Sequence, residues 1–215
     1  MSDYIPPLRH HFLTRFYDPV VRLTTRERVF KHALLVQAQI KPGQEVLDLG
    51  CGTGTLTIQI ARAFPGVIAT GIDADPEALA IARAKAVREV TPVTFTRGFA
   101  QHLPFDSGRF DTVVSSLFFH HLTRTDKKSA LAEAGRVLKP AGELHVADWG
   151  RPANALMHAA FFMVRLLDGF ETTAESVSDG LLELMRAAGF AGIAKTAVVN
   201  TPFGSIGIYR AIKPI

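Results

Sequence analysis

Residues 45–54 read Glu-Val-Leu-Asp-Leu-Gly-Cys-Gly-Thr-Gly, and this stretch decides the fold. Its apolar first half predicts a buried strand, and the glycines at alternate positions predict a turn that opens a helix. We expect Gly50 to allow the sharp turn, Gly52 to let a ligand approach the backbone, and Gly54 to permit close packing where the helix starts. The N–H groups at that helix start favour a carboxylate or a phosphate.

The acidic residue before the turn separates this motif from the dinucleotide fingerprint. That fingerprint is Gly-x-Gly-x-x-Gly, whereas the spacing in this chain is Asp-x-Gly-x-Gly-x-Gly and begins at Asp48. A carboxylate at the strand end would repel a pyrophosphate and attract an ammonium group. A ligand with an amino acid head group, such as S-adenosylmethionine, therefore fits the motif better than NAD does.

The segment resembles the first motif of the class I S-adenosylmethionine-dependent methyltransferases, and further motifs of that family follow in order. Gly71-Ile72-Asp73 ends the next predicted strand, and the resemblance implies that Asp73 holds the ribose hydroxyls. Residues 98–105, 110–114 and 136–144 look like the family's adenine-binding loop, its fourth strand, and the helix end, turn and fifth strand that close the domain. The chain is most similar to the subgroup that includes the ubiquinone and menaquinone biosynthesis C-methyltransferases.

The resemblance implies a cofactor site made of the glycine turn and the ends of the following strands. One position departs from the family pattern, because Phe99 stands where relatives usually have an Asp that accepts from the adenine amino group. Recognition of the base would then rest on stacking and backbone contacts. Tyr17 would hydrogen-bond the cofactor's carboxylate. The other expected cofactor residues are Asp48, Gly50, Cys51, Gly52, Thr53, Asp73, Ala74, Ala100, Gln101 and Ser116.

Strands and helices are predicted to alternate along most of the chain. A helix is expected near 25–40, with Thr24 and Glu27 spaced for a capping box, and Asp75 is expected to cap a helix that has Pro76 at its first position. Short crossovers between strands produce a parallel, doubly wound sheet. The predicted strands are 45–49, 67–72, 93–97, 110–116 and 143–148, and the predicted helices are 54–64, 76–88, 126–138, 153–167 and 176–188.

The last third of the chain predicts two strands, at 193–199 and 206–212, that pair antiparallel at one edge of the sheet. The expected fold is therefore α/β and Rossmann-like, with a mostly parallel seven-stranded sheet, helices on both faces and one antiparallel edge strand. A length of 215 residues suits a single domain. Within it, residues 1–23 are expected to form an N-terminal lid and residues 150–190 the substrate-side helices.

His120 and His121 follow the predicted fourth strand and are the candidate catalytic residues. Methyl transfer requires mainly alignment of the acceptor, but a phenol, an enol or an acidic carbon must also lose a proton to a base. A neutral imidazole can accept that proton near physiological pH. The alternative is structural, with one His capping the following turn and the other packing under the lid. Asp148 either orients an acceptor or caps the next helix, and the cap is favoured.

The acceptor is predicted to be small and apolar, and to be methylated on carbon or oxygen. The segment Ser116-Leu117-Phe118-Phe119 lacks the Asn/Asp-Pro-Pro-aromatic pattern of enzymes that methylate the amines of DNA bases. A quinone precursor, a polyketide, a lipid head group and a small phenol all remain open. The alternatives are an RNA methyltransferase, which the pI of 9.4 permits, and a subunit that binds S-adenosylmethionine without turnover. An NAD-binding protein is a weaker option.

Composition restricts the partners. The net charge is +4, but basic residues are mixed with acidic ones, as in Arg26-Glu27-Arg28, so nucleic acid is an unlikely partner. Cys51 is the only cysteine, which excludes an internal disulfide and a cysteine-built metal site, and no metal is predicted. No secretory signal is visible, which predicts a cytoplasmic protein. The apolar helix near 155–167 is too short to span a bilayer; it covers a substrate pocket or, as the less favoured alternative, rests on a membrane. The oligomeric state stays open.

Overall fold

A computed structural model describes residues 26–152, 157, 180–202 and 204–215. The predicted N-terminal lid with Tyr17 lies outside the described residues. So does the predicted helix at 153–167, apart from Met157, and so do residues 176–179 of the last predicted helix.

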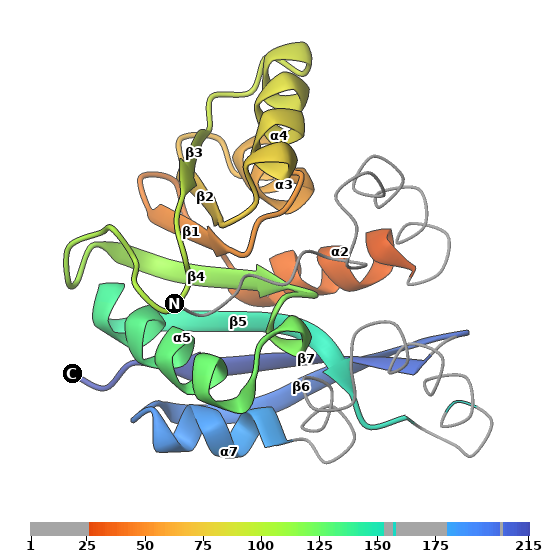
Figure 1. Ribbon diagram of the computed structural model, residues 1–215, viewed down its shortest axis with the longest axis vertical. Helices are drawn as coiled ribbons and strands as arrows, with labels where there is room; N and C mark the ends of the chain where they lie inside the picture. Colours follow the sequence, from red (N-terminus) through yellow and green to blue (C-terminus); the bar gives the residue numbers. More distant parts are fainter. Residues whose placement is uncertain (1–25, 153–156, 158–179, 203) are drawn as a thin grey trace.

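Seven strands form one sheet in the order β3-β2-β1-β4-β5-β7-β6 (Figure 1). Strands β1 to β5 run parallel to one another, whereas β7 runs antiparallel to both β5 and β6. The predicted sheet is therefore confirmed, with its antiparallel pair at one edge; β7 is the reversed strand and β6 is outermost. The strands are β1 (Glu45–Leu49), β2 (Ile68–Asp73), β3 (Thr94–Arg97), β4 (Phe110–Ser116), β5 (Leu138–Gly150), β6 (Ala191–Thr201) and β7 (Gly204–Ile212).

Helices cover both faces of the sheet, because side chains of successive strand residues point to opposite faces. Val46 packs with α2 and α3 on one face, while Leu47 and Leu49 pack with α5 and α7 on the other. The described helices are α2 (Glu27–Ala38), α3 (Thr55–Ala63), α4 (Pro76–Arg88), the short 3₁₀ helix η3 (Phe119–His121), α5 (Arg124–Val137) and α7 (Gly180–Ala187).

Of the two predicted helix caps, one is confirmed and one is wrong. Asp75 caps α4 by accepting hydrogen bonds from the N–H groups of Glu77 and Ala78, as predicted. The capping box predicted for residues 24 and 27 is wrong, because α2 begins at Glu27 and its N-cap is Arg26, in a left-handed conformation without a side-chain cap. The Glu27 carboxylate pairs with Lys31 one turn further along.

The fifth strand is longer than predicted. Leu138 pairs with Phe110, and after an irregularity the regular register resumes with Glu143 opposite Thr112. The strand then continues to Gly150, two residues beyond the predicted end. Residue 148 therefore lies inside a strand.

A partly buried polar network ties the β6–β7 hairpin to α2. The side-chain nitrogen of Gln37 donates to Tyr209 O at 3.0 Å and lies 2.9 Å from His145 Nδ1. The side-chain oxygen of Gln37 accepts a hydrogen bond from the Thr196 hydroxyl. Because the Gln37 amide donates, His145 Nδ1 accepts, and the imidazole proton lies on Nε2, which is 2.9 Å from Glu143. His145 is 0% exposed, and burial lowers its pKa from 6.5 to about 4. The network therefore requires a neutral imidazole.

We expect His145 to make the fold sensitive to acid. The pKa is about 4 in the folded state and 6.5 in the unfolded state, so the unfolded chain binds more protons between these values. The contribution of His145 to the free energy of unfolding is fully present above pH 6.5. It is lost as the pH falls towards 4, by up to about 3 kcal/mol. Urea unfolding across this pH range gives the free energy of unfolding of wild type and of His145→Gln. We expect it to fall more steeply with decreasing pH in wild type than in the variant. Equal pH slopes in the two proteins would contradict it.

The end of α4 holds a β-branched residue in a strained conformation. Val90 has a φ of 50° and is 88% exposed. Its N–H donates to Val87 O, and the N–H of Thr91 donates to Ala86 O. This pattern is a Schellman motif, in which the left-handed position is normally glycine. A valine there is held in place by the helix end rather than by packing.

Replacing Val90 with glycine should therefore stabilise the protein by about 1 kcal/mol, because the left-handed strain is relieved. Chemical denaturation measures the change in the free energy of unfolding. The matched control is Val87→Gly, which makes the same change at an exposed helical position and should lower stability by roughly 0.5 kcal/mol. A loss of stability in both variants would show that Val90 is not strained.

Candidate active site

The glycine turn after β1 is packed tightly on two sides and is open at its middle. A Cβ at Gly50 would lie 2.2 Å from the Phe118 ring, and one at Gly54 would lie 2.6 Å from Phe95. At Gly52, by contrast, no heavy atom of the described chain lies within 4 Å of the Cβ position. All three glycines have positive φ values. The turn therefore presents open backbone at the residue where a ligand was expected to approach.

The carboxylate of Asp73 joins the ends of β1 and β2. It accepts hydrogen bonds from Gly52 N at 2.8 Å and from Asp75 N at 2.9 Å. Burial raises the pKa of Asp73, although these N–H bonds oppose the shift. The Asp73 carbonyl also accepts from Gly98 N, at the start of the loop after β3. Three loops at the rim of the sheet are thus fixed to one residue.

Asp48 is a buried acid at the carboxyl end of β1. It is 1% exposed, and its Oδ2 accepts from the Thr57 hydroxyl at 2.6 Å. Its Oδ1 is buried and has no hydrogen-bond partner among the described residues. Burial raises the pKa of Asp48 to about 6, against the opposing effects of the Thr57 hydrogen bond and the Lys31 charge. A buried acid with one unsatisfied oxygen suits a cationic ligand.

Cys51 and Thr53, in the turn after Asp48, are in contact with β2 and α4. The Cys51 sulfur lies against β2, 2.9 Å from the position that a Cβ at Gly71 would take, and burial raises the pKa of the thiol well above its ordinary value. A buried thiol of this kind is a weak nucleophile. The Thr53 hydroxyl accepts from Lys85 Nζ at 3.2 Å.

The loop after β3 is held by two charged residues of α5. Glu133 accepts from Leu103 N at 2.7 Å, while Arg136 donates to Leu103 O at 3.0 Å and to Phe105 O at 2.8 Å. Glu133 and Arg136 also pair with each other. Ahead of these contacts, Ala100 and Gln101 are buried and partly buried, and the expected stacking residue Phe99 is 43% exposed. These hydrogen bonds therefore fix the position of the loop, although Phe99 replaces the Asp that relatives usually have there.

The two histidines occupy η3, directly after β4. His120 Nδ1 lies 2.7 Å from Asp148 Oδ1, and the backbone N–H of His120 donates to Asp148 Oδ2 at 3.3 Å. Asp148 was expected to cap a helix, but β5 continues through it and its carboxylate binds His120 and the N–H of Trp149 instead. The sequence offered orientation of an acceptor as the less favoured role of Asp148, and the contact with His120 was not predicted.

His121 lies beside His120 with ring centroids 3.9 Å apart. Its Nε2 is buried and has no hydrogen-bond partner in the part of the chain that the structure describes. Burial, helped by His120 and Lys127, lowers the pKa of His121 well below its ordinary value. His121 is therefore a neutral ring near neutral pH.

These groups meet at one rim because β1, β2, β3 and β4 are parallel and their carboxyl ends lie together. Asp48, Asp73 and Ser116 stand at strand ends, and Ala74 and the residues of the loop after β3 follow them. His120 of η3 and Asp148 of β5 add an imidazole and a carboxylate to this rim. Tyr17 lies outside the described residues.

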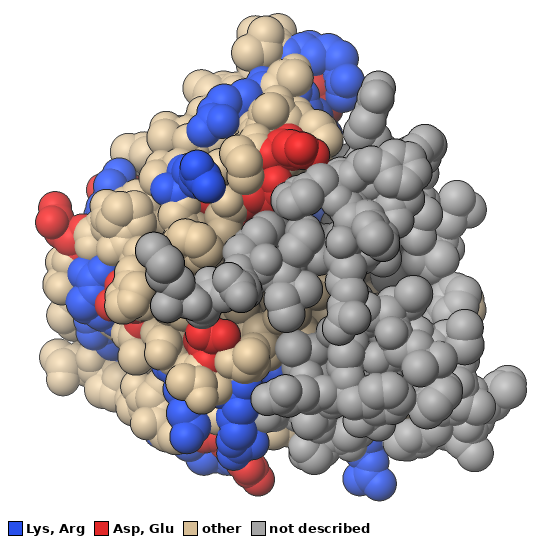
Figure 2. Space-filling view, viewed as in Figure 1, with Lys and Arg blue, Asp and Glu red and all other residues tan. Residues whose placement is uncertain are grey.

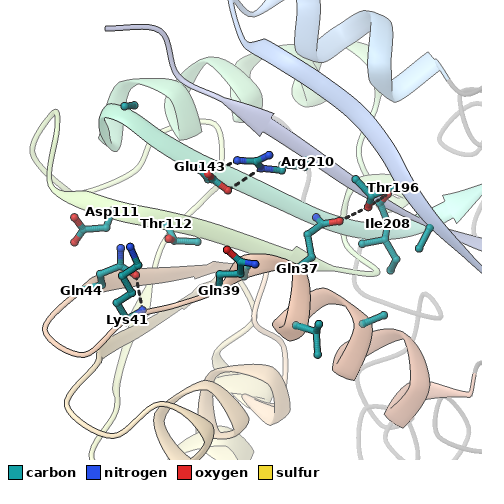
Figure 3. A pocket seen from close by; sticks show the side chains of 15 residues that line it. Gln37, Gln39, Lys41, Gln44, Asp111, Thr112, Glu143, Thr196, Ile208 and Arg210 are labelled. Carbon is teal, nitrogen blue, oxygen red and sulfur yellow. Dashed lines mark hydrogen bonds and ion pairs between the residues drawn. The ribbon is translucent and has the colours of Figure 1, made fainter.

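A separate cavity of about 630 Å³ lies at the opposite end of the strands (Figure 3). It is lined by the end of α2 and by the first residues of β4 and of the regular part of β5, including Gln37, Asp111 and Glu143 (Figure 3). Glu143 pairs there with Arg210, and Asp111 pairs with Lys139. Since Asp111 begins β4 whereas Ser116 ends it, this cavity is not part of the rim.

S-adenosylmethionine fits the residues at the rim. Its ammonium suits the unsatisfied Oδ1 of Asp48, its ribose hydroxyls suit the Asp73 carboxylate, and its amino acid part can pass over the open backbone at Gly52.

Comparisons with known proteins also indicate a methyltransferase. Residues 46–142 match the family model for a methyltransferase domain. The chain is 35% identical over 199 residues to an uncharacterized methyltransferase of Synechocystis sp., covering 91% of this chain and 90% of that protein. It is 30% identical to the ubiquinone/menaquinone biosynthesis C-methyltransferase of Saccharophagus degradans, covering 87% of this chain and 82% of that protein.

Similarity of fold extends to solved structures. A SAM-dependent methyltransferase from Methanosarcina mazei has a TM-score of 0.69 and 22% identity, over 84% of this chain and 97% of that one. The sheet order, the glycine turn with its two rim acids, and the curated relatives all indicate the same assignment. The chain belongs to the class I S-adenosylmethionine-dependent methyltransferases.

Proposed function

We propose that this enzyme methylates a small, largely apolar acceptor on oxygen or carbon, and that the histidine pair of η3 takes the acceptor's proton. The observation that carries the proposal is the position of His120 and His121 at the carboxyl end of β4, beside Trp149 of β5. Buried imidazoles at this rim provide a base where the acceptor must lie.

The bound cofactor supplies an electrophilic methyl group on a positively charged sulfur. The protein must then orient the acceptor, exclude water and hold a proton. Phe119 and Trp149 are both buried next to His120, Phe119 in the hydrophobic cluster on one face of the sheet and Trp149 in the cluster on the other. Apolar surroundings of this kind favour an aromatic or aliphatic acceptor over a highly charged one.

The named relatives support an acceptor related to a quinone. Ubiquinone and menaquinone are quinones, and the C-methyltransferases of their biosynthesis share 30% identity with this chain. The reduced form of such a ring is a phenol, so it also needs a base. We therefore place quinols and phenols first among the acceptors.

The RNA alternative has little support from surface charge. Basic and acidic side chains are interspersed on the face shown in Figure 2, and the described residues there form no continuous basic tract. RNA-binding proteins usually gather Lys and Arg on one face. No helix in the described residues is both long enough and apolar enough to cross a bilayer.

The non-catalytic alternative depends on Phe99, which replaces the usual adenine partner. Calorimetry with S-adenosylhomocysteine tests whether binding survives this change. We expect micromolar binding to wild type and a loss of at least tenfold in Asp73→Ala, because the ribose hydroxyls and Gly52 N both lose their partner. NADH is the comparison ligand. Tighter binding of NADH than of S-adenosylhomocysteine would contradict the cofactor site.

Turnover is tested with S-adenosylmethionine and a panel of acceptors: a short-chain demethylmenaquinol, a simple phenol, a primary amine and an RNA transcript. Mass spectrometry should show a mass gain of one methyl group in the quinol or the phenol. Methylation of the RNA alone would favour the alternative enzyme. Binding without methylation of any of the four would favour the subunit that binds S-adenosylmethionine without turnover.

Cofactor binding should weaken in acid through Asp48. The pKa of this residue is about 6, and only the ionised carboxylate attracts an ammonium. Affinity for S-adenosylhomocysteine should therefore be constant above pH 7 and fall below pH 6, by up to about tenfold per pH unit. Thr57→Val should move the inflection to higher pH, because it removes a hydrogen bond that lowers the pKa. Asp48→Asn should bind weakly without this pH dependence. An unchanged inflection in both variants would assign the effect to another group.

A further inference from the structure

Asp148 distinguishes the two histidines. Its carboxylate is buried and receives three hydrogen bonds, from His120 Nδ1 at 2.7 Å, from His120 N at 3.3 Å and from Trp149 N at 2.7 Å. His121 has no comparable partner among the described residues, and its Nε2 is buried without a hydrogen bond.

The charge of Asp148 determines where the His120 proton lies. Burial alone would raise the pKa of the Asp148 carboxyl group, but the His120 ring and the Trp149 N–H outweigh it and hold that pKa below its ordinary value. An ionised carboxylate only accepts hydrogen bonds, so His120 Nδ1 must donate. In the neutral form of His120 the single N–H group is therefore on Nδ1, and Nε2 carries the lone pair.

We propose that Asp148 is a positioning residue that makes His120 Nε2 the base of the reaction, and that the acceptor is a weak O–H acid such as a phenol, quinol or enol. This inference rests on the proposed function and deepens it, because it selects one histidine and one class of acceptor. A neutral amine would not need a base before attack, and a carboxylate would have no proton to give.

The proton and electron balance follows from this assignment. The acceptor's O–H proton passes to His120 Nε2, and the electron pair left on oxygen, or on a conjugated ring carbon, forms the bond to the methyl carbon. The S–C bond breaks with its electron pair remaining on sulfur. When the new bond is to a ring carbon, the C–H proton is lost to water and the aromatic ring is restored. His120 then releases its proton to solvent.

The charges around His120 come from three elements. Asp148 of β5 stabilises the protonated ring, whereas Lys127 of α5 lies near enough to His121 to act on its charge. His121 of η3 is neutral. Asp148 is thus the negative charge that offsets a proton on His120, and its removal should displace the acid limb of the activity profile to lower pH.

The first measurement is the ¹⁵N NMR spectrum of the imidazoles in wild type without ligand at pH 7.5. We expect His120 to be protonated on Nδ1 and to have a lone pair on Nε2. This readout depends on neither the acceptor nor turnover. A proton on Nε2 with a bare Nδ1 would overturn the role of Asp148.

The kinetic test compares Asp148→Asn with Asp111→Asn, using the short-chain demethylmenaquinol as acceptor. Asp111 lies at the opposite end of β4, so the control makes the same change away from the rim. We expect Asp148→Asn to lower kcat by about 100-fold or more, with little change in KM or in the cofactor Kd. Its acid limb should move to lower pH. Asp111→Asn should keep the wild-type profile.

Asp148→Glu serves as the conservative variant, because it keeps the charge and should recover part of kcat with a wild-type acid limb. Equal losses in Asp148→Asn and Asp111→Asn, or a loss confined to KM, would overturn the positioning role. Methylation of the amine but not of the quinol would overturn the acceptor class. If no acceptor is methylated, the proposed function fails, and the NMR spectrum still decides the role of Asp148.

Discussion

The site depends on the absence of side chains at two glycines. The Phe118 ring occupies the space beside Gly50, and Phe95 occupies the space beside Gly54, so the segment after β4 and strand β3 pack directly against the turn that ends β1. Any Cβ at either position would separate these elements. The hydrogen bond from Gly52 N to Asp73 then fixes the turn to β2. The relative placement of four strand ends follows from this one compact turn.

The elements of this fold and their arrangement in a sheet could be predicted from the sequence, whereas side-chain contacts between distant residues could not. The Asp75 cap and the Pro76 start of α4 depend on neighbouring residues, and the parallel sheet follows from the alternation of elements. The contact between His120 and Asp148 joins residues 28 positions apart. It depends on the register that sets Ser116 opposite Ala147, which no sequence pattern states. The capping box at the start of α2 failed because its spacing is only a local preference.

Two acids at the same rim have opposite environments. Asp48 is buried, one of its oxygens has no hydrogen-bond partner among the described residues, and its pKa rises to about 6. Asp148 is equally buried, but the electrostatic attraction and hydrogen bond of the His120 ring, together with the Trp149 N–H, hold its pKa below the ordinary value. The partners of each carboxylate, not its depth of burial, make the difference. One carboxylate therefore suits a cation that arrives and leaves, and the other suits a permanent partner.

The outer strand β6 shows how the sheet ends. Its pairing with β7 is interrupted twice, between Ala191 and Ala194 and between Lys195 and Ala197. Such irregularities twist an edge and disturb the spacing of its outward N–H and C=O groups. A second chain could not extend this sheet by regular strand addition along the whole length of β6. These irregularities thereby protect the β6 edge against edge-to-edge aggregation during folding and at high concentration.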